Sequence, residues 1–416
     1  MHQDAHGIAV TSDSAAAIRH LDAATRSLLG HRADFAEHLA ASVAVDPDLV
    51  VAHALLGFAQ LLLARAELLD TARRHADTAR RALDRRGATL REMIMVDALD
   101  LWIAGDMTGC ADRLAILLET APHDVLSFKL GYALRFMLGD VAGMRGLAEA
   151  ILPEWDKSVP DYGYVLGCYA FALEEAGEFD RAERLGSAAL ELEPCDVWAY
   201  HAVTHVHEMR QRPSDGLAWL ADRRARSIGI NNFTRHLAWH EALFHLTRRD
   251  LAAVLALYDR EIRDERTDDY RDIANAASLL WRLEREGACV GDRWEELADL
   301  AERRRGDFTL AFGALHRMIC LLGARRPVAR EFASAMARSA TARRSTQERV
   351  IMEVAVPLSR IAHSLSGAAE AVEVDVDALV QRLPAIGGST AQRHTFTLML
   401  ADYAIRKRIS ALPSAA

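Results

Sequence analysis

Lysine, proline and cysteine are all scarce in this chain of 416 residues, and each scarcity excludes a class of protein. Lysine occurs only at Lys129, Lys157 and Lys407, so arginine carries nearly all the positive charge. The net charge is −9, which argues against a general nucleic-acid-binding protein. The five cysteines are scattered and show no metal or redox spacing, so they indicate a reducing compartment rather than a disulfide framework.

Long apolar runs are also missing. The longest, residues 54–64, contains Gln60 and is too short to span a bilayer. The start of the chain, MHQDAHGIAV, lacks the basic segment and apolar core of a signal peptide. We therefore expect a cytoplasmic protein that binds neither membrane nor nucleic acid. Oligomerisation through the last helix, residues 392–408, is an open option, but no heptad pattern in this segment supports it.

The residues that are abundant indicate an all-α protein. Hydrophobic residues make up 51% of the chain, prolines number only 10, and no segment alternates with period two. Helix-ending turns recur at one or two multiples of about 36 residues, as expected for stacked helical hairpins. These turns are Gly105-Asp106, Gly139-Asp140, Gly177-Glu178 and Arg249-Asp250.

Residues 164–194, YVLGCYAFALEEAGEFDRAERLGSAALELEP, resemble a tetratricopeptide repeat. Leu166-Gly167 matches the close-packing pair of its first helix, and Ala182, Ala189 and Pro194 match its second. The first helix is about three residues longer than the motif. We predict a right-handed α-solenoid of degenerate tetratricopeptide-like hairpins over residues 33–416, preceded by an N-terminal segment or first helix over residues 1–32.

Six histidines lie in two short stretches, HAVTHVHE at 201–208 and HLAWHEALFH at 236–245. A spacing of four residues places His201 and His205 on one helix face, and likewise His236 and His240. The two stretches are one repeat apart and both are expected to be first helices, which line the concave side of a solenoid. We therefore predict a site around residues 200–245 that also includes Glu208.

Three interpretations of this site are open. Neutral imidazoles with a nearby carboxylate suit a divalent transition metal such as zinc, with His201, His205, His236 and His240 as ligands. The same four histidines and Glu208 could instead perform metal-free acid–base catalysis or capture a ligand. A purely structural role is the third. His245 lies five residues after His240, so the zinc-protease motif is not matched.

Several segments together resemble the tetratricopeptide repeat protein 38 family: WAYHAVTHVHEM, HLAWHEALFHL followed by ALYDREI, GDRWEELADLAERR at 291–304 and GGSTAQRHTF at 387–396. The resemblance covers the chain from about Ala33 to near its C-terminus. It implies an α-solenoid of degenerate repeats and no established reaction. Relatives are expected to carry a His-Asp pair where this chain has Tyr132-Ala133.

The predicted function is a small-molecule site on this wall, with hydrolytic or proton-transfer chemistry if it is an enzyme. The alternative is an interaction scaffold that binds a peptide in its concave groove, and a solenoid that acts only through its outer face is a third option. Substrate-binding candidates are Trp239 as a stacking surface, His207, His316, and Gln392 with Arg393, the last two mainly through the family resemblance. For His316 a core role competes with this assignment, and for residues 387–393 plain helix capping does.

Overall fold

The computed structural model describes residues 1–367 and 373–410, and it confirms an all-α helical repeat. The one sheet among these residues is a two-stranded antiparallel hairpin at the N-terminus, formed by β1 (His2–Gln3) and β2 (Ala9–Val10). None of the described helices combines the length and the apolar composition that a membrane crossing requires.

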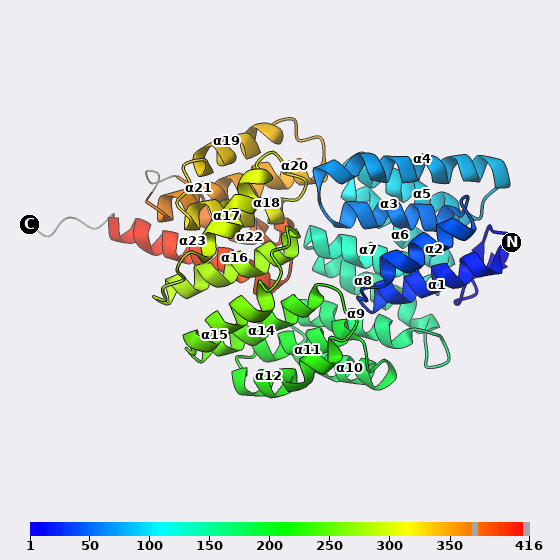
Figure 1. Cartoon of the computed structure of the whole chain (residues 1–416), viewed down its shortest axis with the longest axis horizontal. Helices are drawn as coiled ribbons and strands as arrows, with labels where there is room; N and C mark the ends of the chain where they lie inside the picture. Colours follow the sequence, from blue (N-terminus) through cyan, green and yellow to red (C-terminus); the bar gives the residue numbers. More distant parts are fainter. Residues whose placement is uncertain (368–372, 411–416) are drawn as a thin grey trace, which may run out of the picture. The chain divides into compact units, whose positions relative to one another are not determined.

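The helices form two compact units, residues 1–244 and 245–416, which are described separately. Unit 1 contains six helical hairpins and part of a seventh (Figure 1). Its helices are α1 (Ala15–Leu29), α2 (Phe35–Val45), α3 (Val50–Leu62), α4 (Leu69–Arg86), α5 (Leu90–Ile103), α6 (Met107–Thr120), α7 (Val125–Leu138), α8 (Val141–Ile151), α9 (Tyr162–Glu175), α10 (Phe179–Leu192), α11 (Val197–Met209), α12 (Pro213–Trp219), α13 (Arg223–Arg226) and most of α14 (Phe233–Thr247), with short 3₁₀ turns η1 (Ala66–Leu68), η2 (Leu152–Glu154) and η3 (Leu220–Asp222).

The turns predicted from sequence join the two helices of successive hairpins. Gly105, Gly139 and Gly177 all have positive φ (90°, 66° and 81°), the left-handed conformation that ends a helix most easily at glycine. The side chains of Asp106 and Asp140, which follow the first two of these glycines, accept hydrogen bonds from the first turns of α6 and α8. The periodic turn signal therefore marks the hairpins correctly.

Close packing between α9 and α11 depends on the small residue that the repeat motif places at Gly167. A Cβ at this position would lie 2.2 Å from Asp196 Oδ2 and 3.0 Å from Ala199 Cβ. The side chain of Asp196 in turn accepts a hydrogen bond from the N–H of Trp198 at 2.9 Å and caps α11. The motif glycine thus lets α11 begin directly against α9.

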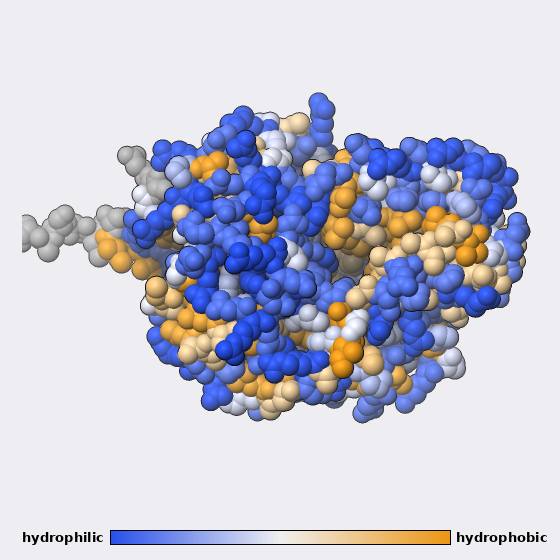
Figure 2. All heavy atoms as spheres, viewed as in Figure 1, coloured by the Kyte–Doolittle hydropathy of each residue, from blue (hydrophilic) through white to orange (hydrophobic). Residues whose placement is uncertain are grey.

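Helix α4 shows how second helices divide their surface between core and solvent. Its buried residues are the small alanines Ala72, Ala76, Ala79 and Ala82, which form a stripe at spacings of three and four. The opposite face carries arginines and aspartates, and Figure 2 shows that hydrophilic residues cover the visible side of this helix. The arginines of α4 therefore belong to a solvated helix surface.

Unit 2 is also helical, and α18 lies at its centre, in contact with α16, α17, α19 and α21. Its elements are the end of α14, α15 (Leu251–Leu257), the π-turn η4 (Tyr258–Ile262), α16 (Tyr270–Arg285), α17 (Arg293–Arg303), α18 (Ala311–Gly323), α19 (Ala329–Ser339), α20 (Thr346–Val350), the π-turn η5 (Ile351–Ala355), α21 (Val356–Leu365), α22 (Val376–Arg382), the 3₁₀ turn η6 (Leu383–Ile386) and α23 (Thr390–Ser410).

Candidate metal centre

The two histidine-bearing helices, α11 and α14, lie beside each other in unit 1, and both are the first helix of their hairpin, as predicted. Residues 197–207 of α11 are all buried, which identifies it as an inner helix. Helix α14 is preceded by Asn231, whose side chain accepts a hydrogen bond from the N–H of Phe233 at 3.0 Å. The N–H of Asn231 donates to the carbonyl of His31 at 2.8 Å. The start of α14 is thereby tied to the loop after α1.

Three imidazole nitrogens meet in a closed triangle between these helices. The Nε2 atom of His201 lies 3.0 Å from that of His236 and 3.1 Å from that of His240. The third side of the triangle, between His236 and His240, is 3.2 Å. His205 is the fourth member of this histidine cluster, and one ring nitrogen from each of the four lies within 4.8 Å of the others.

The triangle is a poor hydrogen-bonding arrangement but a good ligand set. Each Nε2 of a neutral imidazole offers either one N–H or one lone pair in the ring plane, so three of them cannot satisfy three mutual contacts. A tetrahedral zinc ion with bonds of about 2.0–2.1 Å holds its nitrogen ligands about 3.3 Å apart. The observed separations of 3.0–3.2 Å are within a few tenths of an ångström of that value.

A carboxylate from α11 orients one corner of the triangle. Nδ1 of His240 lies 2.8 Å from Oε2 of Glu208, and the imidazole is fully buried. Because an ionised carboxylate only accepts hydrogen bonds, Nδ1 carries the proton and Nε2 presents its lone pair to the other two histidines. This carboxylate–histidine pair is the usual outer-shell support of a metal-ligating imidazole.

A second carboxylate supports the fourth histidine. Nδ1 of His205 lies 3.4 Å from Oε2 of Glu174, which comes from α9, and both side chains are almost completely buried. Glu174 and its neighbour Glu175 also form a metal-type group with His205, in which the ligand atoms are within 4.8 Å of one another. Two of the four imidazoles are therefore backed by a glutamate from the preceding first helix.

Burial and the neighbouring imidazoles favour the neutral form of His201. Desolvation lowers the pKa of His201 well below its ordinary value, and the three neighbouring imidazoles lower it further. Aromatic rings enclose the cluster and contribute to the desolvation: Phe171 stacks on His201 with ring centroids 5.3 Å apart, and Trp198 and Phe233 each lie 5.1 Å from it. Neutral imidazole is the form that binds metals.

The structure brings together all five residues that were predicted to be catalytic or metal-binding. The candidates for substrate binding contact other partners. Trp239 is fully buried, and its ring stacks on His236 at 5.3 Å with an interplanar angle of 14°, so it contacts an imidazole where a substrate was expected. His207 packs against Trp219, with ring centroids 6.0 Å apart. Burial, followed by the positive charge of Arg212, lowers the pKa of His207. His245 contacts Asp250 at 3.6 Å.

The remaining candidates belong to unit 2 and have structural partners there. His316 is buried, its Nδ1 lies 2.8 Å from the carbonyl of Phe312, and it packs between Phe312 and Phe396. Gln392 and Ser389 cap α23 reciprocally: the amide oxygen of Gln392 accepts from the N–H of Ser389 at 3.0 Å, and the hydroxyl of Ser389 accepts from the N–H of Gln392 at 3.2 Å. These contacts match the core and capping alternatives weighed above.

The side chain of Arg393 folds back over the same turn. It donates to the carbonyl of Gly388 and, at 3.1 Å, to the hydroxyl of Thr390, and only 7% of the residue is exposed. Its guanidinium group therefore helps to hold the start of α23. This turn lies in the segment 387–393, for which helix capping was the alternative to substrate binding.

Sequence reasoning missed Glu174, although a signal for it was present. Glu174 and Glu208 are 34 residues apart and are each the penultimate residue of a first helix, α9 and α11. Each faces a histidine of the next first helix, His205 and His240 respectively. The same repeat period that pairs the histidines also relates these two glutamates. We call the contacts of Glu174 with His205 and of Glu208 with His240 the glutamate ladder.

No protein-family model matches the chain. The resemblance to the tetratricopeptide repeat protein 38 family consequently stays an expectation that rests on the segments quoted above.

Proposed function

We propose that the histidine cluster binds one divalent transition metal ion, with zinc as the best match, and that the bound ion serves hydrolytic chemistry on a small molecule. The closed triangle of Nε2 atoms from His201, His236 and His240 carries this proposal. Three neutral imidazoles at tetrahedral spacing form a donor set that suits zinc, and they leave the fourth position for a water molecule.

The fourth histidine, His205, favours a catalytic ion, which keeps one coordination position open, over a structural ion with four protein ligands. Zinc on three imidazoles lowers the pKa of its bound water to about 7, which supplies a nucleophile at neutral pH. His205 stands beside the triangle, within 4.8 Å, with Glu174 behind its Nδ1. With an ion bound, His205 would be placed to accept a proton from such a water molecule, and Glu174 would keep the His205 ring oriented.

Metal-free acid–base catalysis is less well supported by the same geometry. A catalytic base needs a nitrogen that faces the substrate, whereas the Nε2 atoms of three of the histidines face one another. The cluster is not completely sealed from solvent, because His236 is only partly buried and the side chain of Glu208 is 16% exposed.

Metal content tests the first part of the proposal. The full chain, produced without a histidine tag, is stripped with a chelator, reloaded with zinc and measured by mass spectrometry. We expect about one ion per chain, and its loss in a His201→Ala, His240→Ala double variant. His316→Ala is the matched control, because it removes one buried histidine outside the cluster. Equal metal in the double variant and the wild type would overturn the site.

Hydrolysis tests the second part. Zinc-loaded and stripped protein are compared on a panel of p-nitrophenyl esters and phosphoesters, together with the Glu174→Gln variant. We expect metal-dependent turnover that falls about 10²- to 10⁴-fold in kcat in this variant, with the ion retained, because the proton acceptor is then misoriented. Stoichiometric zinc with no metal-dependent turnover on any substrate would sink the hydrolytic part and leave a structural ion.

A further inference from the structure

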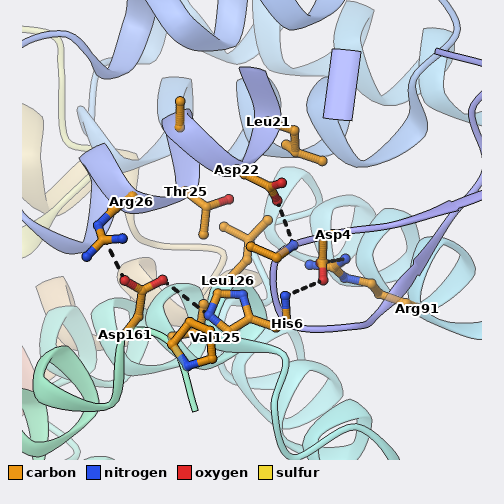
Figure 3. A pocket seen from close by; sticks show the side chains of 13 residues that line it. Asp4, His6, Leu21, Asp22, Thr25, Arg26, Arg91, Val125, Leu126 and Asp161 are labelled. Atoms are coloured by element: carbon orange, nitrogen blue, oxygen red, sulfur yellow. Dashed lines mark hydrogen bonds and ion pairs between the residues drawn. The ribbon is translucent and has the colours of Figure 1, made fainter. Parts of the chain in front are cut away.

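A second site lies at the N-terminal end of unit 1 and shares no residue with the histidine cluster. Residues 4–6 cover a cavity of about 180 Å³ (Figure 3). The walls come from α1, α5, the start of α7 and the loop before α9. The lining side chains that matter here are Asp4, His6, Leu21, Asp22, Arg26, Arg91, Val125, Leu126 and Asp161.

Asp161 is held in an unfavourable state at this cavity. Its φ of 64° is in the left-handed region, which among residues other than glycine is adopted most readily by aspartate and asparagine. Its side chain is 94% buried, with 6% exposed, and Oδ1 accepts no hydrogen bond from the described residues. The closest cation to Oδ1 is Nε of Arg26 at 3.5 Å, and Oδ2 lies 3.2 Å from Nε2 of His6 (Figure 3). A buried carboxylate oxygen in this state calls for a donor from outside the chain.

The charges around the cavity favour a positively charged ligand. Arg91 is buried and already pairs with Asp4 at 2.6 Å and with Asp124 at 2.8 Å. Asp22 accepts the N–H of Ala5 at 3.1 Å and faces the same space (Figure 3). With His6 counted as an imidazolium, the four carboxylates of Asp4, Asp22, Asp124 and Asp161 face three cationic groups, His6, Arg26 and Arg91, and one negative charge is left over.

The direction of the pKa shift of His6 agrees with this excess of negative charge, whereas that of Asp22 reflects burial first. Burial alone would lower the pKa of His6, yet Asp161 and the more distant carboxylates raise it above its ordinary value. Burial raises the pKa of Asp22, and the charge of Asp4 raises it further against the opposing hydrogen bond from Ala5. An imidazolium at His6 is favoured where the local potential is negative, and a cation beside Asp22 would stabilise the ionised form of that carboxyl group.

The rest of the cavity is apolar and small. Leu21, Val125 and Leu126 supply aliphatic surface beside the carboxylates. A cavity of about 150 Å³ accommodates benzene, so a volume of about 180 Å³ holds a ligand of roughly six non-hydrogen atoms. The lining is therefore amphipathic, with acid on one side and hydrocarbon on the other.

We propose that this cavity binds a small organic ammonium cation. The ammonium N–H groups donate to Oδ1 of Asp161 and to the carboxylate of Asp22, and a short alkyl chain packs on Leu21, Val125 and Leu126. Residues 4–6 close over the bound cation, and the ion pairs of Asp4 with Arg91 and of Asp161 with His6 hold that cover in place.

Three ligands of matched shape test the proposal on the full chain: n-butylammonium, neutral n-butanol and anionic n-butyrate. Binding is measured by ligand-observed saturation-transfer NMR and titrated by calorimetry. We expect saturable binding of n-butylammonium at one site, with no comparable binding of the other two. Asp161→Asn should weaken it at least about tenfold, because one charged hydrogen bond is lost. Asn tolerates the left-handed backbone, so the variant retains the local fold.

Asp13→Asn is the control, since it removes one exposed acid near α1 that does not line the cavity and should leave the affinity unchanged. Asp22→Asn gives a second, independent test if Asp161→Asn is less stable than the wild type in a thermal melt, and it should also weaken binding at least about tenfold. Equal binding of n-butanol and n-butylammonium, no binding of n-butylammonium, or unchanged affinity in both cavity variants would overturn the proposal.

Discussion

Buried histidines occur in both units, and the comparison between them separates a site from a core. In unit 2, Nδ1 of His316 contacts the carbonyl of Phe312, and Nδ1 of His363 contacts that of Ser359, at 2.8 and 2.9 Å. Each partner is four residues earlier in the same helix, so the Nδ1 atoms of these imidazoles are bonded locally. In unit 1, His201 and His240 face nitrogens and carboxylates from other helices. Histidines are buried in both units, so burial alone does not identify a site. The histidine cluster is distinguished by side chains from different helices that meet at one point.

The largest expected difference between the two regions is the response of stability to zinc. A ligand at about 1,000 times its Kd stabilises the native state by about 4 kcal/mol. Zinc should therefore raise the melting transition of unit 1 in the wild type and leave it unchanged in His240→Ala. His316→Ala should keep the zinc response while losing stability in unit 2. Calorimetry with and without zinc measures this, and an undiminished response in His240→Ala would contradict the comparison.

The next effect is the pH dependence of unit 2. Burial lowers the pKa of His316 to about 4 from 6.5, so below pH 6.5 the unfolded chain binds a proton that the folded chain resists. The stability is therefore complete above pH 6.5, declines as the pH falls, and has lost up to about 3 kcal/mol by pH 4. Hydrogen exchange of α18 at pH 7 and pH 4 measures the loss. His316→Gln should reduce it, and an equal loss in that variant would assign the effect to other groups.

A third test compares the two carboxylates of the glutamate ladder. Glu208→Gln replaces the acceptor that lies 2.8 Å from His240, a corner of the triangle, and should weaken zinc affinity about 10- to 100-fold. Glu174→Gln acts at 3.4 Å on His205, which is not a corner of the triangle, and should weaken affinity less. Competition titration with a chromophoric chelator measures both. A larger loss for Glu174→Gln would mean that His205 is a ligand in place of one of the three corners.

Helical periodicity was sufficient to predict much of this molecule. The Gly-acid turns predicted the hairpins, and the spacing of His201 with His205 and of His236 with His240 predicted that one wall would hold all four. The repeat period supplied the long-range contact, because it placed α11 and α14 as equivalent first helices. The handedness of the solenoid and its division at residue 32 stay predictions.

Local sequence could not supply the contacts that come from tertiary packing. The stacking of Trp239 on His236 and the packing of His207 on Trp219 depend on which helix face meets which neighbour. The cavity near Asp161 joins residues that are more than 150 positions apart, and no spacing rule predicts it. Its one local sign, a left-handed aspartate, is visible only in the backbone.

The smallest expected effect concerns the turn before α23, which the family resemblance assigned to the site. Gln392→Ala removes half of a reciprocal cap and should lower the free energy of unfolding of unit 2 by about 1 kcal/mol. Zinc content and hydrolysis should stay unchanged, because the amide oxygen that is lost accepts a hydrogen bond from Ser389 in the same turn. Chemical denaturation and metal analysis of the same preparation test both halves. If metal or activity falls while stability does not, Gln392 acts in the site, and the division between a functional cluster in unit 1 and locally satisfied polar groups in unit 2 fails at this position.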